Sequence, residues 1–288
     1  MTPVQALDTA TGKGVRVAIV DTGVDASHPW VGGCVSESYC VERDPEGSRT
    51  VSACNHLDVV GHGTAAAGQI RRFAPQAELV SVRILDGNRA CSSDDLVAAL
   101  EWLVGRDVHV VNMSLSTMRA DKALAICHEI DDINASGTAC VCARGYHQFG
   151  RDYPTTFSST IGITYAELPQ GVIQRRRSEL VELQASGVKV EAAWVGGTRK
   201  VTGSSYACPA VCGLMARLLS TGLVRDATEL KPLLFEIADR QADGWKSQWM
   251  VDVDSPPTPS ACANGPRDRS TESAQTNTVS SHPSKTIA

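Results

Sequence analysis

Three short glycine-containing segments each carry a side chain that could take part in nucleophilic catalysis. Asp21 lies in VDTG directly after a β-branched run, His62 lies between two glycines in GHGT, and Ser205 lies in GSSYACP. A serine hydroxyl is a weak nucleophile until a base takes its proton, and an imidazole can be that base near neutral pH. A carboxylate can fix the tautomer of the imidazole and stabilise its cation. The three residue types together predict acyl transfer through an activated serine.

The setting of Ser205 suits a developing negative charge. An apolar helical stretch over residues 210–219 follows it, and the N-terminal end of a helix dipole is positive. Pro209 falls in the first turn of that helix, where a missing N–H is tolerated. Each segment alone could serve an ordinary turn, but the chain order Asp, His, Ser is one of three in which this catalytic set recurs. Their combination therefore indicates an active site.

These side chains need a framework, and the chain alternates strand-like with helix-like segments. Apolar and β-branched runs predict strands over residues 15–20, 79–85, 108–113 and 138–143. Apolar residues at helical spacing predict helices over 94–104, capped by Ser93 or Asp94, and over 121–135, ended by Gly137. This alternation predicts an α/β fold with a mostly parallel sheet and helices on both faces. Active groups in such sheets gather at the carboxyl ends of strands, where Asp21 and residues 114–116 fall.

Five ordered segments resemble the subtilisin-like (S8) peptidase family over residues 13–240. The three catalytic motifs appear as VAIVDTGVDASHP, DVVGHGTAAAGQI and GSSYACPAVCGLMA, and the intervening FAPQAELVSVRILDG and LVAALEWLVGRDVHVVNMSLS are also similar to the family. The resemblance implies a three-layer α/β sandwich that hydrolyses peptide bonds through an acyl-enzyme. It assigns the catalytic roles to Asp21, His62 and Ser205.

The same resemblance implies a substrate-binding strand. Ser114, Leu115 and Ser116 match the segment that lines the family's cleft and pairs with the substrate as an added strand. Such pairing supplies backbone hydrogen bonds, while pockets read alternate side chains. The alternative for these three residues is an ordinary strand end. The expected partner is a protein or peptide substrate.

The sequence departs from the family where an asparagine normally donates to the oxyanion. Direct alignment places Tyr146 at that position, and Gln148 follows two positions later. A tyrosine hydroxyl or a glutamine amide could donate instead, or no side chain donates. For this family's own asparagine, loss of the donor is known to lower turnover by about 10²–10³. A catalytically weak or inactive binding module with the same fold is therefore the alternative function.

Composition and charge narrow the remaining partners. The 288 residues carry a net charge of −5, which disfavours a general nucleic-acid role. No stretch reaches the about 18 apolar residues of a membrane helix. Residues 1–13 lack the apolar core of a signal peptide, so the chain as given predicts a cytoplasmic location unless a leader is missing. An intracellular peptidase domain that triggers signalling or cell death is a further reading.

The expected organisation is a lead-in over residues 1–12, a peptidase domain over 13–253 and a tail over 254–288. The tail is rich in Ser, Pro and charged residues and carries almost no apolar ones. Such a segment cannot bury enough surface to offset its ordering entropy, which predicts disorder.

The ten cysteines show no zinc-site spacing, so most are expected to be buried free thiols. Cys34 and Cys40 are the best disulfide candidates if the compartment is oxidising. No metal site is predicted. Calcium is the one candidate cofactor, because many members of the family bind it. The sequence shows no loop of spaced ligands, and the acidic residues Asp44, Glu46 and Asp58 are expected to be solvated.

The other acidic and histidine side chains near the motifs are expected to be structural. His28 in SHPW and Asp25 fall in a turn, and His109 and His128 fall on a strand and a helix.

Overall fold

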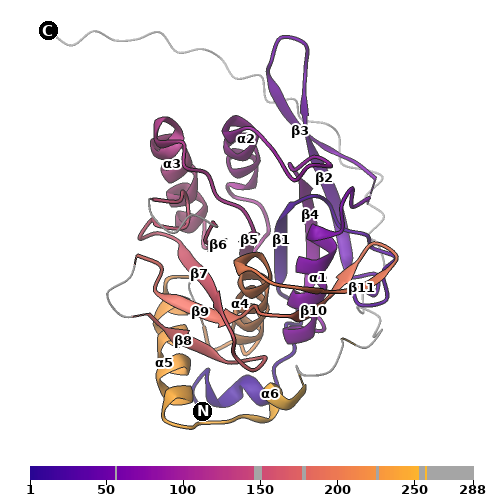
Figure 1. Cartoon of the computed structure of the whole chain (residues 1–288). Coiled ribbons are helices and arrows are strands. Elements are labelled where there is room, and N and C mark those ends of the chain that lie inside the picture. Colours follow the sequence, from indigo (N-terminus) through magenta and orange to yellow (C-terminus); the bar gives the residue numbers. More distant parts are fainter. Residues whose placement is uncertain (56, 146–150, 177–179, 225–226, 253–256, 258–288) are drawn as a thin grey trace, which may run out of the picture.

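The described part of the computed structural model comprises residues 1–55, 57–145, 151–176, 180–224, 227–252 and 257. Within these residues, nine strands form one sheet in the order β3-β2-β4-β1-β5-β6-β7-β9-β8 (Figure 1). Neighbouring strands from β2 to β9 run parallel, and only the edge strands β3 and β8 are antiparallel to their neighbours. The predicted mostly parallel sheet is confirmed.

The strands of this sheet have the following bounds: β1 Arg16–Asp21, β2 Val35–Arg43, β3 Arg49–Ala53, β4 Glu78–Arg83, β5 Val110–Met113, β6 Ala139–Ala143, β7 Ile161–Ala166, β8 Ile173–Arg175 and β9 Leu183–Ser186. A separate antiparallel pair is formed by β10 Val190–Trp194 and β11 Gly197–Val201. The helices are α1 His62–Phe73, α2 Ser93–Leu103, α3 Ala123–Ala135, α4 Ser204–Leu219, α5 Leu230–Ala242 and α6 Gln248–Asp252, with 3-10 turns η1 Gln5–Asp8, η2 Ala120–Lys122 and η3 Ala227–Glu229.

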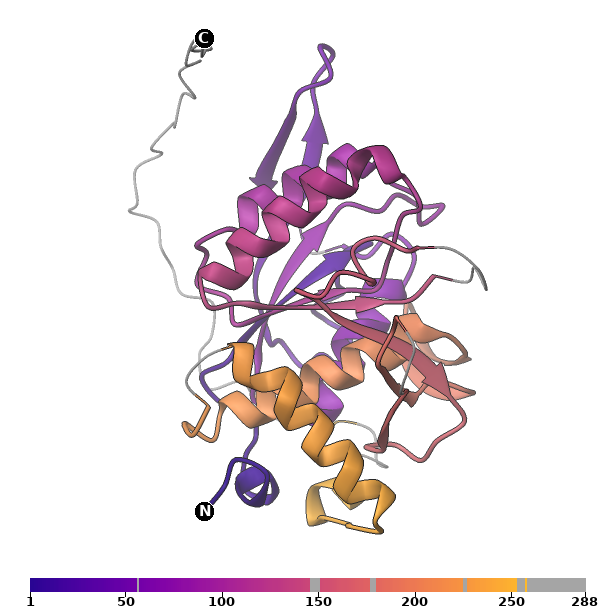
Figure 2. The same ribbon diagram turned by 90° about the vertical axis from the view of Figure 1, so that its left-hand side faces the viewer.

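Helices cover both faces of the sheet because the central strands are apolar on both sides. In β1, Val17 and Ile19 point into one core with α1 and α4, while Ala18 and Val20 point into a second core with α2 and α3. A parallel strand buried on both faces needs this continuous apolar run. Figure 2 shows the result, with α3 on one side of the sheet and the orange helices α4 and α5 on the other.

The helix boundaries follow local capping chemistry. Ser92 caps α2 in a reciprocal capping box with Asp95, one residue earlier than the predicted cap at Ser93 or Asp94. Gly137 ends the α3 region with a φ of 91°, as predicted. These caps fix the helices that pack beneath the second core.

The first residues of the chain pack against the domain. Leu7 in η1 is buried in the larger core, and its carbonyl accepts a hydrogen bond from Arg217 of α4 at 2.9 Å. The predicted tail over residues 254–288 lies outside the described residues apart from position 257. None of the helices in the described ranges is long and apolar enough to cross a membrane.

Candidate active site

The structure brings Asp21 and His62 into direct contact. Asp21 is the last residue of β1 and is fully buried, while His62 is the first residue of α1. The Nδ1 atom of His62 lies 2.7 Å from Oδ1 and 2.9 Å from Oδ2 of Asp21, so an Nδ1–H donates to the carboxylate. This bond fixes the tautomer that leaves Nε2 free to act as a base.

Two glycines allow α1 to start at this point. Gly61 has a φ of 106°, a conformation that L side chains rarely adopt. At Gly63, an added Cβ would lie 2.0 Å from the carbonyl oxygen of Gly23 in the turn after Asp21. The glycines flanking His62 therefore let the helix and the Asp21 turn approach closely enough for the two side chains to meet.

The electrostatics of the pair favour a charged imidazole. Burial lowers the pKa of His62, but the charge and the hydrogen bond of Asp21 outweigh it, and Asp58 adds a smaller effect in the same direction. The pKa of His62 consequently lies above its ordinary value. An imidazolium that forms during a reaction would be stabilised here.

Asp58 joins the two halves of this pair, a role that the sequence analysis missed. Its Oδ1 accepts hydrogen bonds from the Thr22 hydroxyl at 2.7 Å and from the N–H groups of Val60 and Gly61 at 2.9 and 2.7 Å. Its Oδ2 accepts from the N–H and the hydroxyl of Thr64 at 2.8 and 2.6 Å. The expectation that Asp58 is solvated is wrong, because its carboxylate satisfies the N-terminus of α1. The sequence did contain one indication of this role, because Asp58 lies just before the glycine-flanked residue at which a helix begins.

Ser205 is the second residue of α4 and remains partly exposed. Its hydroxyl donates to the carbonyl of Ser114 at 3.2 Å, and among the residues that the structure describes it makes no hydrogen bond to His62. The ring of the next residue, Tyr206, lies 5.6 Å from the His62 ring, centroid to centroid. The start of α4 is therefore beside His62, and the Ser205 hydroxyl would have to turn from Ser114 to reach it.

The predicted substrate-binding residues follow the end of β5, next to Ser205. The Ser114 hydroxyl donates to the carbonyl of Ser205 at 3.1 Å and accepts from Nδ2 of Asn112 at 3.2 Å. Leu115 packs against the second core, and the Ser116 hydroxyl lies near Gly145. The structure thus places Ser114 in contact with Ser205, and the role of residues 114–116 in substrate pairing stays a prediction.

Asn112 connects this segment to two buried thiols of α4. Its Oδ1 accepts from the Sγ atoms of Cys208 and Cys212, each at 3.4 Å. Burial raises the pKa of Cys208 well above its ordinary value, as it also does for Cys142 on β6. These cysteines are the buried free thiols that the sequence predicted.

The predicted Cys34–Cys40 disulfide is wrong. Cys34 is disulfide-bonded, but Cys40 has a free thiol and cannot be its partner. Cys34 precedes β2 and Cys40 lies within it, so the extended backbone of a strand separates them.

Both oxyanion candidates, Tyr146 and Gln148, lie outside the described residues. The segment that leads to them is bonded to Ser204, the residue before Ser205. The hydroxyl of Ser204 donates to the carbonyl of Arg144, and the N–H of Gly145 donates to Oδ2 of Asp152 at 3.1 Å. The chain is therefore adjacent to the start of α4 just before Tyr146.

The remaining residues have the structural roles expected of them. Nε2 of His28 is within 2.7 Å of the Gly197 carbonyl, and Asp25 accepts the N–H of Ser27 in a turn at 2.9 Å. Nδ1 of His109 accepts the N–H of Arg16 at 3.1 Å. None of them touches the Asp21–His62 pair.

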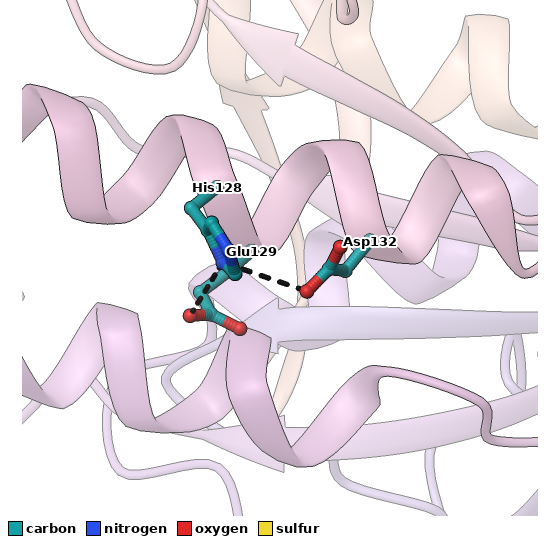
Figure 3. Close-up of side chains that lie close together, drawn as sticks. All are labelled: His128, Glu129 and Asp132. Atoms are coloured by element: carbon teal, nitrogen blue, oxygen red, sulfur yellow. Dashed lines mark ion pairs between the residues drawn. The ribbon is translucent and has the colours of Figure 1, made fainter. Parts of the chain in front are cut away.

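His128 belongs to a small exposed group on α3 (Figure 3). Its Nδ1 lies 3.6 Å from Glu129 and 3.5 Å from Asp132. Within the described residues, these three side chains are the one set found that could together hold a metal ion. Calcium takes six to eight oxygen ligands, which these residues do not supply. Calcium binding elsewhere stays a prediction.

Comparison with known proteins identifies the family. The chain matches the Subtilase family, Peptidase S8, over residues 12–248. It is 28% identical over 221 residues to the thermostable alkaline protease of Halalkalibacterium halodurans, covering 73% of this chain and 58% of that protein. It is 29% identical over 228 residues to subtilisin E of Bacillus subtilis, covering 73% of this chain and 56% of that protein. The aligned region thus spans little more than half the length of these relatives.

Solved structures agree in fold. A cold-adapted subtilisin-like serine proteinase superposes with a TM-score of 0.65 at 24% identity, covering 78% of this chain and 82% of that chain. Sphericase superposes with a TM-score of 0.66 at 22% identity, covering 81% and 88%. The α/β architecture is therefore that of subtilisins, and the chain belongs to the subtilase (S8) family of serine peptidases.

Proposed function

We propose that this chain is a serine endopeptidase that hydrolyses peptide bonds through an acyl-enzyme on Ser205. The observation that carries the proposal is the buried Asp21–His62 pair, with Nδ1 of His62 at 2.7 Å from Asp21, beside the first turn of α4, which contains Ser205. Membership of the subtilase family supports the reaction class. The expected substrate is a protein or peptide.

In the acylation step, Ser205 would be the nucleophile, His62 first the base and then the acid, and Asp21 the stabilising carboxylate. The Ser205 hydroxyl turns toward His62, Nε2 takes its proton, and Oγ attacks the carbonyl carbon of the scissile bond. Asp21 stabilises the imidazolium that forms. The C–N bond then breaks, the proton passes from His62 to the leaving amine, and the acyl group stays on Ser205.

Deacylation would reverse the proton path. A water gives a proton to Nε2 of His62 and attacks the acyl carbon. The bond to Ser205 breaks, the proton returns to the serine oxygen, and the carboxylic product leaves. The positive end of the α4 dipole would favour the negative charge that develops in both steps. The Ser205 N–H is the proposed backbone donor to the oxyanion, and Tyr146 and Gln148 are the candidate side-chain donors.

A fluorophosphonate probe tests this proposal, because it reacts only with an activated serine. The probe should label the wild-type chain on Ser205, and Ser205→Ala should abolish labelling. The neighbouring Ser204→Ala variant is the matched control and should still be labelled on Ser205. Failure of the wild type to react under conditions that label subtilisin E would rule out an active nucleophile.

A second candidate function is a peptide-binding module without turnover. It is favoured by the absence of the family's asparagine and by the hydroxyl of Ser205, which donates to Ser114 and not to His62. Peptide binding with no product, unchanged in Ser205→Ala, would support this function. Product formation that depends on Ser205 would eliminate it. Location in the cytoplasm is a further proposal, to be checked by fractionation of the source cells.

A further inference from the structure

Two free thiols lie side by side where the β2–β3 hairpin leads toward the active site. Cys40 of β2 is opposite Ser52 of β3, and Cys54 comes two residues after Ser52 with its N–H bonded to the Ser38 carbonyl at 3.0 Å. Residues two apart on an extended strand point to the same face, so Cys54 is a diagonal cross-strand neighbour of Cys40. Both thiols are free, and the Cys40 thiol is near enough to add to the rise in the pKa of Cys54.

The two thiols differ in access. Cys40 is 3% exposed, whereas Cys54 is only partly buried and lies just beyond the end of β3. A small oxidant would therefore reach Cys54 first, with Cys40 behind it as the second thiol. Cys54 lies one residue beyond β3, so a shift of its backbone toward Cys40 would put at risk only its own hydrogen bond to the Ser38 carbonyl and would leave the paired residues of β3 in place.

This pair is close to the candidate active site. Cys40 pairs with Arg83 of β4, and Arg83 pairs with Asp21 of β1 in the same row of the sheet. Two strand spacings separate the Cys40 and Asp21 backbones by about 10 Å. Along the chain, Cys54 precedes Asp58 by four residues, and Asp58 holds the start of the His62 helix.

We propose that Cys40 and Cys54 form a disulfide when the chain meets a small-molecule disulfide such as oxidised glutathione. The bond fastens the end of the hairpin to the segment that carries Asp58.

Thiol–disulfide exchange with oxidised glutathione forms the bond in two steps. The Cys54 thiol loses its proton, and the thiolate attacks one sulfur of oxidised glutathione and releases the first glutathione thiolate. The Cys40 thiol then loses its proton and attacks Sγ of Cys54, which releases the second glutathione thiolate. The two protons end on the two glutathiones, and the two electrons from the protein thiols reduce the glutathione disulfide.

Oxidation should be slow at neutral pH and faster in alkali. Burial raises the pKa of the Cys54 thiol, the hydrogen bond to Cys40 adds to this, Arg83 opposes it and Glu42 adds a little more. Only the thiolate reacts, so the rate of the first step should rise about tenfold per pH unit between pH 7 and pH 9.

Mass spectrometry of the full-length chain tests the proposal. The Ser205→Ala background prevents self-cleavage, so the outcome does not depend on whether the chain is a peptidase. After oxidised glutathione and blocking of free thiols in acid, digestion should yield a peptide pair linked through Cys40 and Cys54. Cys54→Ser should lose this pair, and Cys127→Ser, which removes a thiol of α3, should keep it.

Thermal unfolding supplies the second readout. Closing the loop between residues 40 and 54 should raise the Tm of the oxidised chain by about 5–10 °C relative to oxidised Cys54→Ser. The Cys34 disulfide is present in both chains and contributes equally to the two Tm values. Recovery of both cysteines in blocked form, a lasting glutathione adduct on Cys54, or a cross-link without a rise in Tm would each overturn the proposal.

Discussion

Among single residues, Asp58 receives hydrogen bonds from both sides of the Asp21–His62 pair. The Thr22 hydroxyl reaches it from the turn after Asp21, and the N–H and hydroxyl of Thr64 reach it from the first turn of α1. Its negative charge also adds to the rise in the pKa of His62. We therefore infer that Asp58 positions the base and tunes its protonation without touching the reacting atoms.

Replacing Asp58 with asparagine should change the pH profile as well as the rate. His62 must be neutral to accept a proton, so kcat/KM should rise with pH through the His62 pKa. Loss of the Asp58 charge lowers that pKa, and the rising limb should move to lower pH, with a lower plateau because the helix is less firmly held. Asp44→Asn, at an exposed turn, should leave the limb in place. A rate loss with no shift of the limb would limit Asp58 to a purely structural role.

Substitution can identify the side chain that donates a hydrogen bond to the oxyanion. If Tyr146 donates through its hydroxyl, Tyr146→Phe should lower kcat by about 10²–10³ with little change in KM, since the bond forms mainly in the transition state. If Gln148 donates, Gln148→Ala should show that loss and Tyr146→Phe should not. Steady-state kinetics on a fluorogenic peptide distinguish the two. Full activity in both variants would leave the backbone N–H groups of α4 as the donors.

Single residues differ in how far the sequence revealed them. Asp21 and His62 were predictable, because glycines and a preceding strand mark a turn that must approach something closely. The role of Asp58 was not predictable, because the sequence does not show whether a loop carboxylate faces water or, as here, accepts five hydrogen bonds. The Cys34–Cys40 pairing failed because spacing along the chain does not report the direction of the side chains.

At the scale of elements, the junction of β5 and α4 holds Ser205, the proposed nucleophile. Asn112 on β5 accepts from two thiols on α4 and donates to Ser114, whose hydroxyl reaches the Ser205 carbonyl. The bonds of Asn112 are buried, the Ser114–Ser205 bond is partly buried, and together they connect the strand end to α4. Movement of either element would therefore move Ser205.

Asn112→Ala should destabilise this junction. It leaves the Cys212 thiol without an acceptor, Cys208 with only the Met113 carbonyl at 3.9 Å, and the Ser114 hydroxyl without a donor. The free energy of unfolding should therefore fall by about 1–3 kcal/mol. Urea unfolding followed by circular dichroism measures this difference. Asn88→Ala, on an exposed loop, should change it by less than about 0.5 kcal/mol. Equal stability of the two variants would mean that the junction is held by packing alone.

The elements predicted from sequence are those with apolar runs. The central strands β1, β4, β5 and β6 were recognised because both of their faces are buried. β2 reads as SESYCV with polar residues between apolar ones, and β11 is almost wholly exposed, so neither gave a strong strand signal. Tertiary pairing created these strands more than local preference did.

At the scale of the whole molecule, Arg217 connects the η1 region and the α6 region to the core. Its guanidinium donates to the carbonyls of Phe73 at the end of α1 and Leu7 in η1, and it lies 5.8 Å from the centre of the Trp249 ring. Asp8 in turn accepts hydrogen bonds from Ser247 and from the N–H of Trp249. The first residues, expected only as a lead-in, are thus bonded to α4 and to the region of α6.

Arg217→Met should loosen the η1 region and the α6 region together. The methionine keeps part of the volume but leaves two buried carbonyls without their charged donor, so the free energy of unfolding should fall by about 2–4 kcal/mol. Hydrogen exchange should increase at residues 5–8 and 248–250. Arg240→Met, which breaks only an exposed pair on α5, is the control and should change stability little. Unchanged hydrogen exchange at residues 5–8 and 248–250 in Arg217→Met would show that Arg217 does not hold these two regions.

The central claim is that Ser205 becomes acylated during turnover, and rapid acid quench with intact-protein mass spectrometry tests it most directly. The chain is mixed with an activated acyl ester and sampled from milliseconds to seconds. We expect the mass to rise by one acyl group on Ser205, to decay at the rate of turnover, and to be absent in Ser205→Ala. Product formed without any acyl group on Ser205, or neither product nor acylation under conditions that acylate subtilisin E, would contradict the claim.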